Sequence, residues 1–209
     1  MKPFNRFLLK IASIFFPKKV YGSDNLPKGE AVLVCNHFSF IDPVYLVSFI
    51  KEDISVLAKK ELFIKKFPNK LLTSYGGIPI DRDNPDIKTI ISVIKILKSG
   101  KKVAIFPEGT RNKTKTTDLQ PIKSGSTLFA VKAKCPIVPI MIQKKAKLFV
   151  RNKIIIGKPF ELNEYYDKKL TPDDHKEMDN IVFNKMVEEQ KRLLDIINSK
   201  RKINEIPNL

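Results

Sequence analysis

A buried strand, a short turn and an apolar helix are predicted, in this order, by residues 31–50, AVLVCNHFSFIDPVYLVSFI. The first five residues are all apolar, which is typical of a strand that is covered on both faces of its sheet. Asp42 followed by Pro43 is a favourable helix start, with the Asp at the N-cap and the Pro at the first helical position. We therefore predict that the chain leaves a central strand at Cys35 and enters a helix near Asp42.

Strand-like and helix-like segments continue to alternate outward from this unit. A second helix is predicted to start at Asn84-Pro85, again a capping residue followed by Pro, and to end at Gly100. This alternation is typical of an α/β domain with a mainly parallel central sheet flanked by helices on both faces, which we place at residues 21–209. Further strands are predicted at residues 54–58, 103–106, 137–142 and 148–156, and further helices at 124–134 and 171–199.

The N-terminal segment arranges its apolar and basic residues on opposite sides of a helix. Over the first 16 residues, six large apolar side chains share one helical face. We predict a basic amphipathic helix at residues 1–20 that lies on a membrane surface, with its cations near anionic headgroups. The alternative is a helix packed on the protein's own core, and a cleaved signal peptide is disfavoured because Lys10 interrupts the apolar region. The apolar face consists of Phe4, Phe7, Leu8, Ile11, Ile14 and Phe15.

The chain is strongly basic, since 39 Lys and Arg against 22 Asp and Glu give a formal net charge of +17. This charge favours anionic partners, namely phosphate esters, acidic lipid surfaces, acidic carrier proteins or nucleic acid, and does not choose among them. Six of the basic residues are arginines, whose planar guanidinium suits a phosphate better than a Lys ammonium does. The arginines that lie in motifs are therefore candidates for phosphate contacts.

Two further features limit the class of protein. Cys35 and Cys135 are the only cysteines, and each lies in an apolar run, which excludes a disulfide framework or zinc site and favours a reducing compartment. The longest stretch without a charged residue, residues 31–41, is far shorter than the roughly 20 residues that span a bilayer. If this protein meets a membrane, we expect it to lie on the surface.

His37, one of two histidines, directly follows the predicted central strand, where α/β folds often place reactive groups. Asp42 lies five residues further on, and in a regular helix two such side chains would be about 140° apart. A bend over residues 36–42 could bring the carboxylate onto the imidazole, where it would fix the tautomer and stabilise the cation. His37 would then be a general base, although a structural His and a plain helix cap are the alternatives for this pair alone.

Two more strand ends carry groups suited to phosphate binding. The segment GGIPIDR ends in Arg82, and the segment FPEGTR ends in Arg111. In the second segment, Gly109 permits a tight turn in which backbone N–H groups can approach an anion, and Arg111 would clamp that anion. The alternative for this hexapeptide is a turn with a surface ion pair between Glu108 and Arg111.

Together these motifs resemble those of the glycerolipid acyltransferases of the 1-acylglycerol-3-phosphate acyltransferase (PlsC-like) family. Four blocks of that family occur in order and at familiar spacing, and they span about half of the chain. The blocks are NHFSFID at residues 36–42 for the family's N-H-x4-D, GGIPIDR at 76–82, FPEGTR at 106–111 and IVPI at 137–140. IKSG at residues 122–125 is similar to a further family segment that usually begins with Phe.

The resemblance implies an acyltransferase-like fold and a 1-acylglycerol-3-phosphate O-acyltransferase activity. Such an enzyme moves a fatty acyl group from acyl-CoA or an acyl carrier protein to the sn-2 hydroxyl of lysophosphatidate, which makes phosphatidic acid for phospholipid synthesis. The implied general base is His37 with Asp42 as its orienting partner, without a metal or a cofactor other than the acyl donor. We expect a peripheral or monotopic protein on the cytoplasmic face of the cell membrane. The residues implied around the substrate are Asn36, Arg82, Glu108, Gly109, Thr110 and Arg111, with Lys123 and Gly125 as further contacts.

Other interpretations stay open from the residues alone. Within the enzyme class, the acceptor could be glycerol-3-phosphate or another lysophospholipid, and Cys35 could carry an acyl intermediate activated by His37. Outside it, a basic nucleic-acid-binding protein is supported only by charge, since the sequence has no RRM, KH, helix-turn-helix or zinc pattern. A membrane-binding protein without catalysis would need vesicle binding without turnover. His175 is expected to be a solvated surface residue.

Overall fold

The structure, a computed structural model, describes residues 9, 11, 13–64, 66–81, 86–114, 118–122 and 126–204. These residues form one seven-stranded sheet with the strand order β1-β7-β6-β2-β5-β3-β4. The strands β6 and β7 are antiparallel, and every other neighbouring pair in this sheet is parallel, which confirms the predicted mainly parallel sheet. The strands are β1 (Lys18–Tyr21), β2 (Ala31–Cys35), β3 (Ile54–Lys59), β4 (Gly77–Ile80), β5 (Lys102–Ile105), β6 (Ile137–Ile142) and β7 (Asn152–Ile156).

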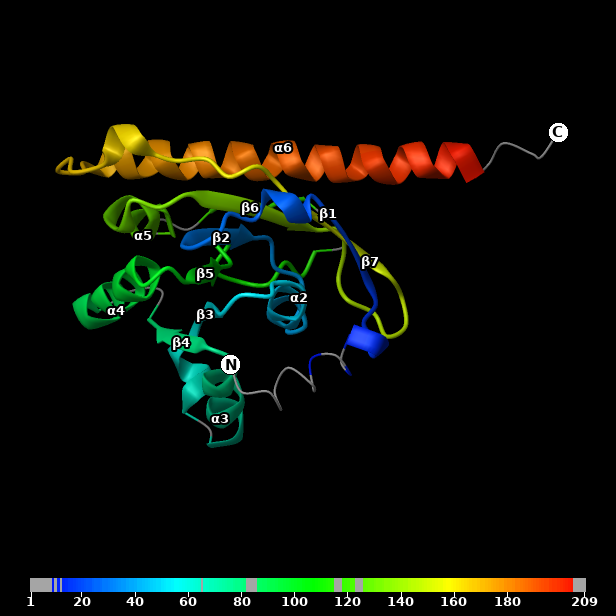
Figure 1. Ribbon diagram of the computed structural model, residues 1–209, viewed down its shortest axis with the longest axis horizontal. Helices are drawn as coiled ribbons and strands as arrows, with labels where there is room; N and C mark the ends of the chain where they lie inside the picture. Colours follow the sequence, from blue (N-terminus) through cyan, green and yellow to red (C-terminus); the bar gives the residue numbers. More distant parts are fainter. Residues whose placement is uncertain are drawn as a thin grey trace.

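Helices cover both faces of this sheet, as predicted (Figure 1). Helices α4, α5 and α6 pack on one face, and α6 runs along the top of the view in Figure 1, whereas α2 packs on the opposite face. The helices are α2 (Asp42–Phe49), α3 (Lys66–Ser74), α4 (Ile87–Lys98), α5 (Ser126–Ala133) and α6 (Pro172–Asn204), and the short 3-10 helices are η1 (Ser23–Asn25), η2 (Lys60–Phe63) and η3 (Asn163–Tyr165).

Strand β2 lies between β6 and β5, and its sequence explains this central position. All five of its residues, AVLVC, are buried. Val32 and Val34 join the core under α4, α5 and α6, while Leu33 and Cys35 join the core on the α2 face. This alternation follows from the two-residue period of a strand, and an apolar side chain at every position lets both faces be covered. The turn after β2 therefore starts from a strand that is held on both sides.

The carboxyl ends of β2, β3, β4, β5 and β6 lie along one edge of the sheet, here called the carboxyl rim. Because β7 runs opposite to β6, its first residue, Asn152, lies at this rim as well. Strand β1 is parallel to β7 and pairs Lys18 with Asn152, which brings the chain before β1 to the same edge. The segment before β1 and the β6–β7 connection therefore share the rim with the turn after β2.

Two helix starts differ from the predictions. The N-cap of α2 is Ile41 rather than Asp42, and Asp42 is the first helical residue. Helix α4 begins after Asp86, whose carboxylate accepts the N–H of Thr89 at 2.7 Å. The dipeptide Asn84-Pro85, which was expected to start this helix, lies outside the described residues. The prediction missed Asp86 because Asn and Asp are about equally favourable N-caps and only the fold selects between neighbours.

Two predicted boundaries near the C-terminal half also move. The strand predicted from residue 148 begins at Asn152, and residues 147–150 instead form a turn closed by a bridge between Lys147 and Val150. Helix α6 continues past the predicted end at Ser199 to Asn204. Both shifts reflect the weak local signals that end these elements.

The predicted N-terminal helix is only partly described. Residues 9, 11 and 13–15 are helical, whereas residues 1–8, 10 and 12 lie outside the described part of the chain. The predicted helical segment cannot extend to residue 20, because residues 18–21 form β1 and pair with β7. Leu9 is buried against the α2 face, while Ile14 and Phe15 are 69% and 41% exposed. None of the helices within the described ranges is long and apolar enough to cross a membrane.

Candidate active site

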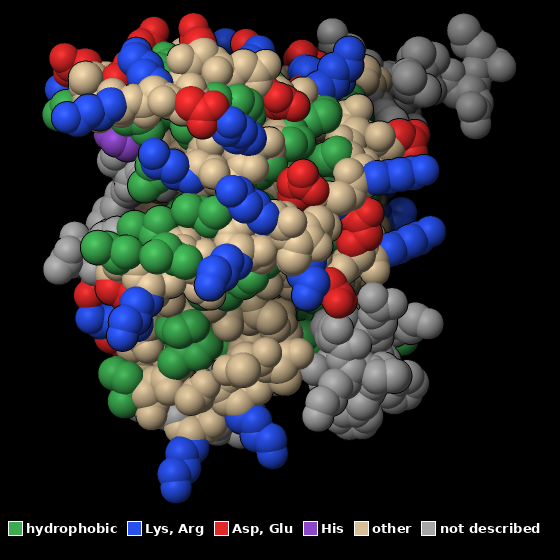
Figure 2. Space-filling view, turned by 60° about the vertical axis from the view of Figure 1, so that its left-hand side comes forward, with side chains coloured by type: hydrophobic (Ala, Val, Ile, Leu, Met, Phe, Trp, Pro, Cys, Tyr) green, Lys and Arg blue, Asp and Glu red, His purple; other side chains and the backbone are tan. Residues whose placement is uncertain are grey.

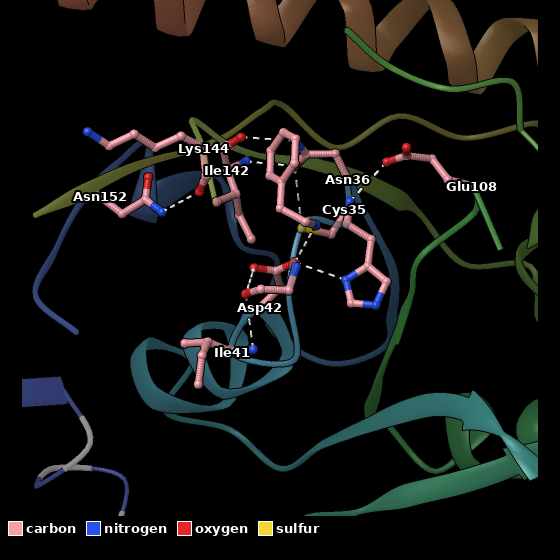
Figure 3. Close-up of polar contacts among 11 residues, drawn as sticks. Cys35, Asn36, Ile41, Asp42, Glu108, Ile142, Lys144 and Asn152 are labelled. Atoms are coloured by element: carbon pink, nitrogen blue, oxygen red, sulfur yellow. Dashed lines mark hydrogen bonds and ion pairs between the residues drawn. The ribbon is translucent and has the colours of Figure 1, made fainter. Parts of the chain in front are cut away.

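The turn after β2 places His37 at the carboxyl rim, and Asn36 holds the start of this turn (Figure 3). The side-chain amide of Asn36 donates to the carbonyl of Ile142 at 2.9 Å, and its oxygen accepts the N–H of the same residue at 2.7 Å. These two bonds extend the pairing of β2 with β6 by one residue. Asn36, which the resemblance places near the substrate, therefore uses both ends of its amide to position the turn.

The predicted bend is present, and it brings His37 and Asp42 into direct contact. The Nδ1 atom of His37 lies 2.9 Å from Oδ2 of Asp42, which is fully buried. The same oxygen accepts the backbone N–H groups of Phe38 and Ser39, each at 2.6 Å, and Oδ1 accepts the Ser39 hydroxyl at 3.0 Å. A carboxylate that accepts from all these donors leaves Nδ1 of His37 as a donor and Nε2 with its lone pair. This tautomer leaves the lone pair on Nε2 that a general base requires.

The other side of the imidazole is held by residues after β5. The ring of Phe106 stacks on the His37 ring with the centroids 4.2 Å apart and the planes at 28°. The backbone carbonyl of His37 accepts the N–H of Asn112 at 2.7 Å, and the Asn112 side chain organises the following loop through bonds to Thr114 and to the carbonyl of Asp118. Neither Phe106 nor Asn112 was predicted individually as a site residue, although both lie in or next to the FPEGTR block.

Glu108 has a different environment from the one predicted. Its Oε1 atom accepts the backbone N–H of His37 at 2.9 Å, and Oε2 accepts the N–H of Gln120 at 3.4 Å. Burial raises the pKa of this carboxyl from 4.5 to about 7, the two N–H groups oppose this rise, and the charge of Asp42 adds to it. Because its oxygens face the His37 turn and the following loop, Glu108 holds the backbone of that turn, and the alternative surface ion pair with Arg111 is not formed.

Arg111 and Phe40 bring together the turns after β5 and β2. The guanidinium carbon of Arg111 lies 3.9 Å from the centroid of the Phe40 ring, a cation–π contact that orients the fork at the rim. Phe40 is 63% exposed, and within the described ranges no carboxylate is within ion-pair distance of Arg111. The charge of Arg111 is therefore not neutralised by a described carboxylate, and its predicted contact with an anionic group stays a prediction.

The remaining predicted substrate residues are only partly placed. Gly109 adopts the positive φ of 67° that its predicted tight turn requires, but its N–H donates to the carbonyl of Phe106 and is not free for an anion. Thr110 is exposed at the rim. Arg82, Lys123 and Gly125 lie outside the described residues, so their predicted contacts with the substrate stay predictions.

The cysteines and the second histidine do not join this site. Cys35 is fully buried on the α2 face, and burial raises the pKa of its thiol well above the usual value, so the thiol is protonated near neutral pH. The same cause raises the pKa of Cys135 to about 12. His175 was expected to be a solvated surface residue, but it is partly buried near the start of α6 with no hydrogen-bond partner for Nδ1 among the described residues. No group of three potential metal-binding side chains occurs in the described ranges.

The sequence of this chain is similar to those of known acyltransferases. Residues 18–143 match the family model described as Acyltransferase. Over 154 residues, 70% of this chain and 75% of the other protein, the sequence is 36% identical to the 1-acyl-sn-glycerol-3-phosphate acyltransferase of Bacillus subtilis. The enzyme of the same name from Borreliella burgdorferi is 31% identical over 65% of this chain but only 54% of its own length, so the chain spans about half of that relative.

The fold is also found in a solved structure. The crystal structure of the 1-acyl-sn-glycerophosphate (LPA) acyltransferase PlsC from Thermotoga maritima superposes with a TM-score of 0.65, covering 88% of this chain and 78% of that one. The two sequences are 24% identical, so this likeness concerns the fold. It confirms the predicted α/β class with a mainly parallel sheet flanked by helices.

Proposed function

Because this chain belongs to the Acyltransferase family, we propose that it transfers a fatty acyl group to the free hydroxyl of 1-acyl-sn-glycerol-3-phosphate and thereby makes phosphatidic acid. The single observation that carries this proposal is the contact between His37 and Asp42 at the rim, 2.9 Å between Nδ1 and Oδ2, within the matched residues. An alkyl hydroxyl is a weak nucleophile at neutral pH, and a base with a fixed tautomer is what its activation requires.

In the proposed reaction, Nε2 of His37 takes the proton of the sn-2 hydroxyl as the oxygen attacks the thioester carbonyl of the acyl donor. Asp42 stabilises the imidazolium that forms, since its carboxylate faces Nδ1. The tetrahedral intermediate then collapses, the carbon–sulfur bond breaks, and the proton on Nε2 passes to the leaving thiolate. The ester is formed, the thiol is released and His37 returns to its neutral state. These steps use the protein groups and the two substrates alone.

The phosphate of the acceptor is proposed to bind Arg111, whose guanidinium lies at the rim on the Phe40 ring. A planar guanidinium can donate two parallel hydrogen bonds to a phosphate, which fixes the distance between phosphate and reacting hydroxyl. Glu108 is proposed to act indirectly, since its carboxylate holds the backbone of His37. Arg82, Lys123 and Gly125 are proposed to complete the substrate contacts on the basis of their motifs.

The donor is proposed to be acyl-CoA or an acyl carrier protein. Both carry phosphate or carboxylate charges, and both suit a chain with a net charge of +17. A lysophospholipid acceptor resides in a bilayer, so we propose that the enzyme works as a peripheral protein on the cytoplasmic face of the membrane. The acceptor could also be glycerol-3-phosphate or another lysophospholipid, because His37 could deprotonate its hydroxyl and Arg111 could bind its phosphate in the same way.

The proposal is tested with purified chain on phosphatidylcholine–phosphatidylglycerol vesicles that contain lysophosphatidate, supplied in turn with acyl-CoA and with acyl carrier protein. Phosphatidic acid should appear with the wild type and not with His37→Ala. Parallel reactions with glycerol-3-phosphate and with lysophospholipids of other headgroups decide the acceptor. Absence of product from the wild type with every donor and acceptor would overturn the proposal. Adding a metal chelator is expected to leave the rate of acyl transfer unchanged.

A further inference from the structure

We propose that the β6–β7 connection is a membrane-insertion element, in which residues Leu148, Phe149 and Val150 enter the apolar boundary of an anionic bilayer. These three residues are here called the apolar tip. Ile14 and Phe15 would enter beside them, and the neighbouring cations would contact lipid phosphates. This inference deepens the proposed function and rests on it for the claim that docking serves catalysis, because it names the surface by which the enzyme meets its lipid substrate.

The three side chains of the apolar tip are exposed to solvent instead of being buried in the core. Leu148, Phe149 and Val150 are 54%, 65% and 39% exposed, and Ile14, which precedes Phe15 in the chain, is 69% exposed. The tip is joined to the N-terminal helix by two contacts: the Phe149 N–H donates to the carbonyl of Phe15 at 2.7 Å, and the two rings lie 5.6 Å apart. Contiguous exposed apolar surface of this kind marks an interaction site rather than a contribution to the fold.

The backbone at Phe149 supports the same conclusion. This residue adopts a φ of 58°, which is favourable for Gly and tolerable for Asn or Asp but costly for a bulky aromatic side chain. Fold stability alone would place Gly or Asn at such an exposed turn. A Phe that is both exposed and in a left-handed conformation therefore indicates a role outside the fold, and an aromatic ring at a lipid boundary is such a role.

The charges around the apolar tip fit an anionic surface. The segment QKKAKLFVRNK, residues 143–153, contains five cations and no acidic residue. A basic hollow beside it is lined by Ser13, Pro17, Lys18, Lys19, Val20 and Arg151. By contrast, acidic and basic side chains are interspersed along the top of the face in Figure 2, where α6 lies. A row of cations next to apolar side chains matches lipid phosphates above acyl chains, and each such cation adds to the binding.

The apolar tip lies at the same edge of the sheet as His37, so a bilayer that binds the tip would also be near the candidate site. The β6–β7 connection leaves β6 at Ile142, the residue whose backbone is bound by Asn36 beside His37 (Figure 3). Its return into β7 is held by Asn152, which donates to the carbonyl of Lys144 at 2.6 Å. Most of the other exposed large apolar side chains also follow strand ends at the carboxyl rim: Phe40, Leu62, Ile64 and Ile87. A bilayer that accepts the tip would thus face the rim that bears His37.

The test uses the full chain and vesicles of equal parts phosphatidylcholine and phosphatidylglycerol. In Phe149→Asn the apolar ring is lost without a change of charge, and Asn tolerates the positive φ, so this variant is expected to fold. Its partitioning to vesicles should fall about tenfold, as expected for the loss of one inserted aromatic ring. The matched control is Leu194→Asn on α6, which also removes an exposed apolar side chain, 42% exposed, and should bind like wild type.

A second pair of variants tests the cations. Arg151→Gln should weaken vesicle binding and reduce its dependence on salt, whereas Lys185→Gln on α6 should do neither. Wild-type binding by Phe149→Asn, or no binding by the wild type, would overturn the inference. A tip that instead holds two copies together would also overturn it, and light scattering would then show a dimer that Phe149→Asn dissociates while vesicle binding stays unchanged.

Acyl transfer between donor and acceptor with chains short enough to stay dissolved separates this inference from the proposed function. We expect Phe149→Asn to keep this soluble turnover and to lose turnover on vesicles. If the wild type has no acyl transfer at all but binds vesicles through Phe149, the proposed function fails and the insertion element stands. If turnover is present and vesicle binding is independent of Phe149, the insertion element fails and the proposed function stands.

Discussion

The carboxylate of Glu108 accepts the backbone N–H of His37 at 2.9 Å, although the two residues are 71 positions apart in the chain. This bond ties the turn after β2 to the turn after β5. Phe106 and Asn112, from the same segment as Glu108, hold the ring and the carbonyl of His37. The orientation of the His37 imidazole therefore depends on a second strand end.

Replacing Glu108 by Gln should change how stability depends on pH. The pKa of Glu108 is about 7 in the folded protein and 4.5 ordinarily. The contribution of its protonated carboxyl to folding stability is therefore fully present below pH 4.5 and is lost as the pH rises through 7. Between these values the free energy of unfolding of the wild type should fall by roughly 2 kcal/mol relative to Glu108→Gln. Urea unfolding across this pH range measures the difference, with Glu61→Gln, an exposed carboxylate, as the control. Parallel curves for wild type and Glu108→Gln would contradict the expectation.

His37→Ala should lower acyl transfer by roughly 10²–10⁴-fold or more, because positioned general-base catalysis contributes about this factor. The fold should remain, since the imidazole is at the rim and its backbone bonds to Glu108 and Asn112 do not need the side chain. The matched control is His175→Ala, which removes the other histidine of the chain. Steady-state rates with circular dichroism of each variant decide the matter, and equal losses in both variants would argue against a specific role of His37.

Asp42→Asn should lower kcat by at least about a hundredfold, since the amide no longer stabilises the imidazolium or selects the tautomer. It should also cost about 1–3 kcal/mol of stability, because Oδ2 accepts the backbone N–H groups of Phe38 and Ser39. Ser39→Ala removes only the hydroxyl bond to Oδ1 and should keep most of the activity. If Ser39→Ala lost as much activity as Asp42→Asn, the charge of Asp42 would not be the cause.

Cys35→Ala should retain acyl transfer. The thiol is buried on the α2 face and its pKa is raised well above the usual value, so it does not supply a thiolate nucleophile. Cys135→Ala, the other buried cysteine, is the matched control and should behave in the same way. Intact-protein mass spectrometry after rapid quenching with acyl donor should find no acyl adduct, and a thioester on Cys35 would instead establish the covalent route.

Arg111→Lys should raise the KM for lysophosphatidate about tenfold or more while changing kcat less, because an ammonium cannot form the two parallel bonds of a guanidinium. Phe40→Leu removes the ring face under the guanidinium and should raise the same KM by a smaller factor. Kinetics with an acceptor panel that includes a phosphate-free analogue are the check. An unaltered KM in Arg111→Lys would place the phosphate elsewhere.

Local patterns predicted most of the elements and the contact between His37 and Asp42. Apolar runs bounded by turn residues located β2, β3 and β6, because a strand covered on both faces needs an apolar residue at every position. The bend between His37 and Asp42 was predictable because a helix cannot bring residues five positions apart together. The helix starts were less certain, since Asp42 has its carboxylate engaged by His37, Phe38 and Ser39 rather than used as an N-cap.

The amino-acid order alone was sufficient for the fold class, the His37–Asp42 contact and the tight turn at Gly109, because these depend on periodicity and on bonds within a few residues. Folding decided the roles of the polar residues whose partners lie far away. Glu108 has one basic neighbour within four positions, Arg111, yet it binds the backbone of His37 instead. Asn36 binds Ile142, which is 106 positions away. The physical reason is that burial and the nearest unpaired backbone N–H set a polar side chain's partner, and both are properties of packing that no local pattern records.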